Sequence, residues 1–211
     1  MIQKGLVNLR KTSWLQKLKM IVIKYKHGKA VQMKGDVRIF GRLPIFKIPG
    51  KGKIIFGHKV VLNSDFIKSN TALTYKCTLV CGWEGIIEIG DNTMLNGVCI
   101  TSYKQVIIGK NCQIASSTLI TDTDYHPINP IIREKEVLGY KINFNEVNKK
   151  EVIIGDNVWI GWGAIILKGV HIGDNSIIAA GSVVVGNVPA NVLIAGNPAV
   201  IKKDFSHFST A

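Results

Sequence analysis

Aliphatic residues recur at every sixth position through the C-terminal part of the chain. The series that starts at Ile154 reads Ile154, Ile160, Ile166, Ile172, Ile178 and Val184. A helix repeats near every 3.6 residues and a half-buried strand every two, so neither element alone explains this spacing. The pattern therefore predicts a structural unit six residues long.

Two further columns of the repeat indicate a bend in each unit. Asn and Gly adopt positive φ more readily than other residues, so a column that favours them marks a tight turn. The fifth column is small or β-branched and is expected to face inward with the aliphatic column. The fourth column reads Asn157, Gly163, Gly169, Asn175, Gly181 and Asn187, and the fifth reads Val158, Ala164, Val170, Ser176, Ser182 and Val188.

Sides of six residues with a bend at each corner close into a triangle after three sides. One coil then takes about 18 residues, and coils stack at the parallel-strand spacing of roughly 4.8 Å. A weaker upstream register has one extra residue between its second and third members. That register comprises Ile89, Leu95, Ile108, Ile114 and Ile120, with Asn92 and Asn111 as bends, Cys99 and Cys112 in the inward fifth column, and Phe56 and Leu62 as the start of another copy. The fold class expected is all-β, a parallel β-helix.

The chain divides into three parts on this pattern. Residues 1–35 form a basic helical segment, residues 36–198 form the β-helix, starting between Val37 and Ile55, and residues 199–211 form a polar tail. The period vanishes from about residue 126 to residue 151, a polar stretch that begins at His126. An inserted loop of that length within a compact repeat is usually functional or disordered.

Charge is concentrated at the N-terminus. The chain of 211 residues has a formal net charge of +13, and residues 1–29 contain no Asp or Glu. An amphipathic helix is predicted there, because Trp14, Leu18, Ile21, Val22 and Tyr25 keep helical spacing, and Ser13 is a candidate cap. Two roles stay open and are compatible: the helix covers the open end of the β-helix, or it lies on an anionic membrane surface. No motif supports nucleic-acid binding.

The sequence contains neither a continuous apolar run of 18 residues nor a signal-peptide pattern at its start. Its four cysteines lack metal-type spacing and are interpreted as reduced core thiols. The expected location is cytoplasmic. Peripheral contact with the inner face of the membrane is compatible with that location.

One of the five histidines stands out by position. His27 and His207 lie outside the repeats, and His58 and His171 occupy corner or outward positions. His126 lies in "ITDTDYHPIN", where the last upstream repeat enters the long loop, between the body and the insertion. A lone histidine is more often structural than catalytic, so position alone does not assign its role.

The C-terminal repeats, "IGDNVWIGWGAIILKGVHIGDNSIIAAGSVVVGNVPANVLIAGNPAVI", resemble those of the hexapeptide-repeat acyltransferases. They are similar in almost every column to galactoside and maltose acetyltransferases and to surface-polysaccharide O-acetyltransferases. The resemblance runs from about residue 54 to residue 203. It implies a left-handed β-helix, a homotrimer, acetyl-CoA as donor and active sites between neighbouring subunits.

The resemblance also implies a set of site residues. His126, followed by Pro127, matches the catalytic histidine, and Asp122 or Asp124 is expected to orient its ring as the acid of a triad does. The donor residues implied are Trp162, through its amide, with Ala180, Val185, Gly186 and Lys203. Asn96 and Tyr103 lie near acceptor positions, and Tyr103 replaces an acidic ligand of galactoside-type relatives. No metal is expected.

The function expected is an acetyl-CoA-dependent O-acetyltransferase that acts on a sugar hydroxyl, in capsule or O-antigen synthesis. The alternatives are N-acetylation of an amino-sugar nucleotide and acetylation of a small molecule such as a galactoside, maltose, serine or an antibiotic. A metal-dependent enzyme of the same architecture would need three clustered histidines. A non-catalytic assembly module is the alternative from a different class.

Overall fold

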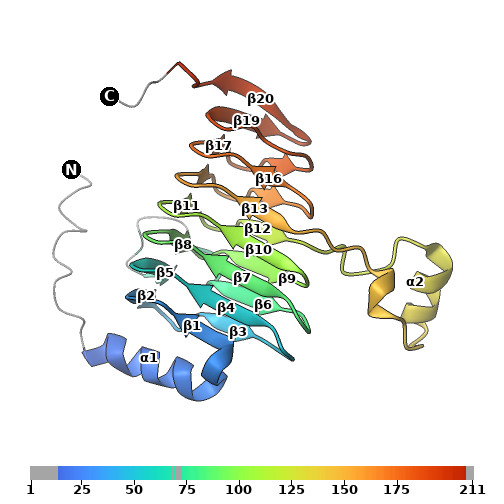
Figure 1. The fold of residues 1–211 in the computed structure, drawn as a ribbon, viewed down its shortest axis with the longest axis horizontal. Helices are drawn as coiled ribbons and strands as arrows, with labels where there is room; N and C mark the ends of the chain where they lie inside the picture. Colours follow the sequence, from blue (N-terminus) through green and yellow to red (C-terminus); the bar gives the residue numbers. More distant parts are fainter. Residues whose placement is uncertain (1–13, 68, 70–72, 208–211) are drawn as a thin grey trace.

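The computed structural model describes residues 14–67, 69 and 73–207. Three parallel sheets, named A, B and C here, run along the molecule, and through most of it each strand pairs with the strand three places further on. The chain therefore crosses sheets A, B and C in turn and then begins the next level (Figure 1). This is the three-sided coil that the six-residue period predicts.

Each sheet is built from short strands. Sheet A contains β1 (Val31–Met33), β4 (Lys53–Phe56), β7 (Ile86–Ile89), β10 (Gln105–Ile108), β13 (Val152–Ile154) and β16 (His171–Ile172). Sheet B contains β2 (Val37–Gly41), β5 (Val60–Ser64), β8 (Met94–Asn96), β11 (Gln113–Ile114), β14 (Trp159–Ile160), β17 (Ile177–Ile178), β19 (Val192–Gly196) and β20 (Ala199–Asp204). Sheet C contains β3 (Ile45–Lys47), β6 (Thr78–Cys81), β9 (Cys99–Ser102), β12 (Leu119–Thr121), β15 (Ile165–Ile166) and β18 (Val183–Val184).

The predicted inward columns form the core. All six aliphatic residues from Ile154 to Val184 are buried, with at most 3% of any of them exposed. The fifth column is buried as well, and Phe56 and Leu62 begin the earlier copy as predicted. The core is therefore one largely apolar column along the axis, because every coil contributes buried side chains at the same positions of the repeat.

The predicted bends mostly carry left-handed backbone. Five of the six fourth-column residues from Asn157 to Gly181 have positive φ, as do Asn92 and Asn111 upstream. The sixth, Asn187, does not have positive φ, whereas Asn191, four residues further on, has a φ of 61°. Asn187 instead accepts a hydrogen bond through Oδ1 from the His171 N–H at 3.0 Å. The last coil therefore closes with a different turn.

The apparent one-residue insertion upstream is the sum of two departures from the six-residue period: one step is a residue short, and the next is two residues too long. Leu95 and the next core residue, Ile100, are five positions apart, and Ile100 and Ile108 are eight apart. Val98 is consequently the buried residue before β9, and Cys99 is only half-buried, so the prediction that Cys99 faces inward is wrong. Cys112 is buried as predicted. The longer step enlarges the corner at residues 102–104.

The ends of the coil depart from the expected boundaries. The first strand begins at Val31, before the predicted start, and residues 199–204 form β20, which pairs antiparallel with β19. Helix α1 (Trp14–His27) and the 3-10 turn η1 (Gly28–Ala30) lie across the N-terminal end (Figure 1). The candidate cap Ser13 lies outside the described residues.

All four cysteines are free, and three of them are buried. Burial raises the pKa of Cys81 to about 12, an effect that the nearby Asp122 carboxylate reinforces. None of the described helices has both the length and the apolarity to cross a membrane.

Candidate active site

An arm of residues 122–151 leaves the coil between β12 and β13 (Figure 1). Its two ends pair in an antiparallel bridge between Thr123 and Lys149. The Asp124 N–H donates to the Asn148 carbonyl at 3.0 Å, and the Lys150 N–H donates to the Asp122 carbonyl at 2.8 Å. This paired neck fixes where the arm departs, and His126 comes directly after it.

Helix α2 (Pro130–Val137) folds the arm back toward its own neck. Asn129 caps the helix by accepting a hydrogen bond from the Ile131 N–H at 3.0 Å, and Pro130 occupies the first turn. Both residues are typical of helix starts. The Arg133 guanidinium donates to the Pro127 carbonyl at 3.0 Å. A second short turn, η2 (Phe144–Glu146), leads back to the coil.

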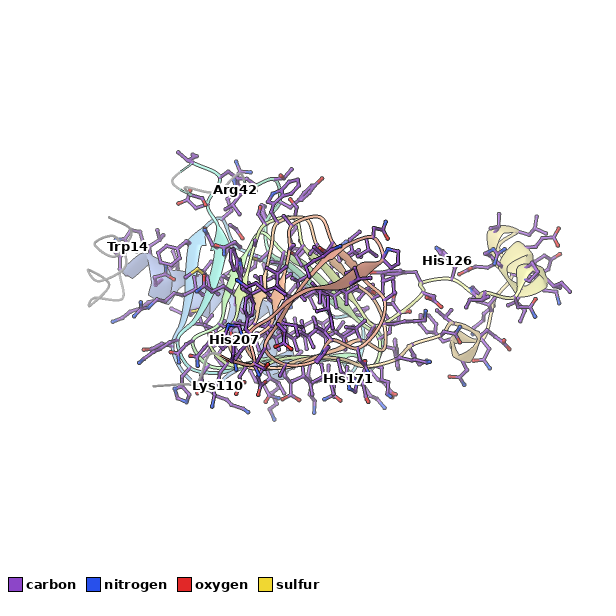
Figure 2. The ribbon with its side chains drawn as sticks, turned by 90° about the horizontal axis from the view of Figure 1, so that it is seen from above. Trp14, Arg42, Lys110, His126, His171 and His207 are labelled. Atoms are coloured by element: carbon purple, nitrogen blue, oxygen red, sulfur yellow. The ribbon has the colours of Figure 1, made fainter. Side chains whose placement is uncertain are left out.

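The acid that contacts His126 is on α2. His126 Nδ1 lies 3.0 Å from Glu136 Oε2. An ionised carboxylate can only accept, so this contact places the proton on Nδ1 and leaves Nε2 as the basic nitrogen. Nε2 has no partner among the described residues. The side chain is 67% exposed and lies on the neck clear of the coil body, whereas His171 lies on the body (Figure 2).

Asp122 binds the enlarged corner at residues 102–104, below the arm. Its buried carboxylate accepts hydrogen bonds from Ser102 Oγ at 2.9 Å and from the backbone N–H groups of Tyr103 and Lys104, each at 2.7 Å. These are the residues that the eight-residue step adds. Asp122 therefore holds the backbone of one coil from the next coil and does not contact His126.

Asp124 also has another partner. Its Oδ1 lies 2.6 Å from Lys168 Nζ, on the coil above, and Asn148 Nδ2 donates to Oδ2 at 3.4 Å. The prediction that one of the two aspartates contacts the ring is thus corrected, because Glu136 occupies that place. The signal for Glu136 in the sequence was the Asn–Pro helix start, which the inserted loop was not expected to contain.

A cleft of about 300 Å³ lies between the coil and the returning arm. The Tyr103 ring stacks on Phe144 with 5.3 Å between centroids and an 11° interplanar angle. Burial raises the pKa of the Tyr103 hydroxyl, and the neighbouring Tyr125 and Asp122 add to the effect. The cleft is lined by Trp83, Glu84, Tyr103, Phe144, Asn145 and Lys149.

The second acceptor candidate, Asn96, does not reach this cleft. It ends β8 at the corner between sheets B and C, and both ends of its amide are engaged. Its Oδ1 accepts from Asn63 Nδ2 at 3.1 Å, and its Nδ2 donates to the Ile114 carbonyl at 3.2 Å. In the single chain Asn96 therefore links successive coils.

Two of the donor candidates share the corner between sheets B and C. Trp162 follows β14, Ala180 follows β17, and both are exposed. The Trp162 carbonyl accepts from the Gly181 N–H at 2.8 Å, whereas the Trp162 N–H has no acceptor among the described residues. A methyl group built on Gly163 or Gly181 would meet nothing within 4 Å. This corner is therefore open and offers an unpaired amide.

The remaining donor candidates lie elsewhere. Val185 and Gly186 follow β18, at the corner between sheets C and A from which the arm also departs two levels below. Lys203 is exposed on β20, with Nζ 5.3 Å from the centroid of Phe205. His126 and Trp162 thus stand at different corners, separated by the face of sheet C, and one chain does not join them into one site.

The described residues contain no group of three or more His, Cys, Asp or Glu side chains that could hold a metal ion. His58 and His171 are exposed on the coil, as expected from their repeat positions. The three-histidine arrangement that a metal-dependent relative requires is therefore absent from this part of the chain.

Known proteins with similar sequences share this repeat. Residues 151–185 match the family model described as the hexapeptide repeat of succinyl-transferase. A putative acetyltransferase of Saccharomyces cerevisiae (strain ATCC 204508 / S288c) is 45% identical over 125 residues, or 58% of this chain and 59% of that protein. The putative lipopolysaccharide biosynthesis O-acetyl transferase WbbJ of Escherichia coli (strain K12) is 35% identical over 127 residues, or 59% of this chain and 63% of that protein.

A solved structure agrees with the sequence matches. The hexapeptide-repeat-containing acetyltransferase of Vibrio cholerae O1 biovar eltor, complexed with acetyl coenzyme A, is 31% identical with a TM-score of 0.52. The match covers 61% of this chain and 65% of that one. The chain spans about three fifths of the length of the two curated relatives. This protein thus carries hexapeptide repeats and resembles the hexapeptide-repeat acetyltransferases in both sequence and fold.

Proposed function

We propose that the protein is an O-acetyltransferase that moves the acetyl group of acetyl-CoA to a sugar hydroxyl. The observation that carries the proposal is the His126–Glu136 pair, which leaves Nε2 as an exposed base on a fixed neck. A general base is the group that such a transfer needs, because a neutral hydroxyl is a weak nucleophile. The named relatives support the donor and the reaction class.

The transfer requires one proton acceptor and no covalent enzyme intermediate. His126 Nε2 takes the hydroxyl proton while the sugar oxygen attacks the thioester carbonyl carbon. The tetrahedral intermediate then expels the thiolate, the carbon–sulfur bond breaks, and the imidazolium returns the proton to the sulfur. The Glu136 carboxylate stabilises the imidazolium and holds the ring, as the acid of a triad does.

The donor fits the open corner between sheets B and C. An unpaired amide such as that of Trp162 suits the oxygen of the tetrahedral intermediate, which carries negative charge. Small exposed residues around Ala180 leave room for an extended pantetheine arm against the backbone. A cation such as Lys203 suits a phosphate of the nucleotide. We assign Val185 and Gly186, which lie across sheet C from that corner, to further donor contacts in the assembled protein.

A complete site then needs two copies of the chain. His126 and Trp162 lie at different corners of one coil, so the histidine of one copy must meet the donor corner of another. Cyclic assemblies join such unlike surfaces without leaving either one free. The assembly proposed is a homotrimer of left-handed β-helices with three equivalent sites.

The acceptor class follows from the cleft beside the arm. The exposed ring of Trp83 suits stacking on a sugar ring, and Glu84 and Asn145 supply hydrogen-bond partners for hydroxyl groups. Together with the name of the E. coli relative, this favours a role in surface polysaccharide synthesis.

The test is release of free thiol from acetyl-CoA across a panel of sugars, nucleotide sugars and oligosaccharides. We expect an oligosaccharide to support release and the His126→Ala variant to lose about a hundredfold or more in rate. His171→Ala is the matched control, because that exposed imidazole has no part in the mechanism and its hydrogen bond to Asn187 uses the backbone. Full activity in His126→Ala contradicts the proposal, as does release with none of the panel.

A further inference from the structure

Helix α1 has two apolar faces, and only one of them contacts the coil. Toward the coil, Ile23 is buried, Met20 packs against the core, and Gln16 exchanges hydrogen bonds with the backbone of Ile39. Lys19 Nζ donates to the Gly41 carbonyl at 2.7 Å. This face covers the end of the first coil, so the covering role predicted for the helix is present.

The opposite face carries the larger apolar residues. Trp14, Leu18, Ile21 and Tyr25 follow the spacing of one helical stripe and are 75%, 46%, 62% and 91% exposed. At 100° per residue this stripe is centred on the side away from Gln16, Met20 and Ile23. These are four of the five residues whose spacing predicts an amphipathic helix, and all four are exposed, although Ile21 also borders a hollow beside Asp36 and Val37 of the first coil.

Lysines flank the exposed stripe on both sides. Lys17 and Lys24 border one side of it, Lys26 borders the other, and all three are exposed. The sequence has no Asp or Glu before Asp36, so no acid of the helix offsets them. A helix that only closed the coil would present polar residues to water on this face.

We propose that this face of α1, comprising Trp14, Leu18, Ile21 and Tyr25 with Lys17, Lys24 and Lys26, docks the protein on an anionic lipid bilayer. Apolar side chains with an aromatic residue at each end enter the interface, and the flanking ammonium groups meet lipid phosphates and carboxylates. The positive charge complements an anionic bilayer and disfavours pairing of two such faces, which would repel each other. The proposal does not depend on the acetyltransferase assignment.

Geometry supports the orientation. The axis of α1 runs across the direction in which the coils stack (Figure 1), so the stripe forms the base of the molecule. The neck of the arm follows β12, the fourth strand of sheet C from the base. Four coils at about 4.8 Å place the neck roughly 20 Å above the docked helix.

The experiment is co-sedimentation of the full chain with phosphatidylcholine vesicles that contain or lack phosphatidylserine. Binding is expected only with phosphatidylserine and is expected to fall as salt rises. The double variant Trp14→Ala, Tyr25→Ala should bind about tenfold or more weakly. Trp159→Ala is the matched control, because it removes another exposed tryptophan, from sheet B.

Charge reversal separates the electrostatic part. Lys24→Glu should weaken binding about fivefold or more, whereas Lys141→Glu, an exposed lysine on the arm, should leave it unchanged. Circular dichroism checks that each variant is folded. The proposal fails if the full chain ignores anionic vesicles or if the stripe variant binds as the native chain does. It also fails if that variant alters only the mass of the protein in solution, which would make the stripe a self-association surface.

Discussion

At the scale of single residues, the site depends on one unexpected pairing. His126 was identifiable because it stands where the repeat stops, but its acidic partner was not, since Glu136 reaches it only through a helix inside the insertion. The two nearby aspartates were reasonable candidates by sequence distance. The structure uses their charges to fix the enlarged corner and to attach the neck to the coil above.

The Glu136→Gln variant tests this pairing. The amide can donate to the ring and favour the tautomer with the proton on Nε2, so we expect the acetyl-transfer rate to fall about tenfold or more, while folding stability stays close to native. The rate in acetyl-CoA thiol release is compared with that of Glu134→Gln on the same helix. Equal rates for the two variants contradict the assigned role.

At the scale of elements, the coil repeats because each corner meets the same conformational demand. The Asn and Gly column predicted seven of the sixteen left-handed residues in the described part of the chain, and the aliphatic column predicted the core. The repeat pattern did not predict the corners that are formed by residues other than Asn and Gly or by steps other than six residues. Ser117 and Tyr125 have φ of 61° and 64° without being Asn or Gly, and the five- and eight-residue steps around Ile100 cancel to one apparent insertion.

Asparagines at the bends also form a ladder that can be tested. Asn175 has a φ of 59°, accepts from Asn157 Nδ2 at 2.9 Å and donates to Asn191 Oδ1 at 2.9 Å. Asn175→Ala loses both bonds and places a methyl side chain in a left-handed conformation, so the free energy of unfolding should fall by about 2–3 kcal/mol.

Asn175→Gly separates the two contributions. Glycine keeps the bend and loses only the side-chain hydrogen bonds, so its loss should be about 1 kcal/mol at these exposed positions. Urea unfolding followed by circular dichroism gives both values. An Ala variant as stable as the Gly variant would show that the left-handed bend contributes little.

At the scale of the whole molecule, the three proposed sites occupy different levels of one coil. The base carries the apolar stripe of α1, the middle carries the arm with His126, and the upper coils carry the open donor corner (Figure 1). If both proposals hold, the proposed catalytic base His126 lies roughly 20 Å from the lipid surface. That distance suits a sugar some way along a membrane-attached glycan.

The most direct test of the central claim is complementation between two inactive variants. Acetyl-CoA thiol release would be measured for His126→Ala, for Ala180→Trp, which fills the exposed donor corner without disturbing the core, and for the two chains co-expressed. If His126 of one copy meets the donor corner of the next, each variant alone is inactive and the mixture regains about a quarter of the native rate. A mixture as inactive as its parents would contradict a site shared between copies, and an active His126→Ala would contradict its role as the base.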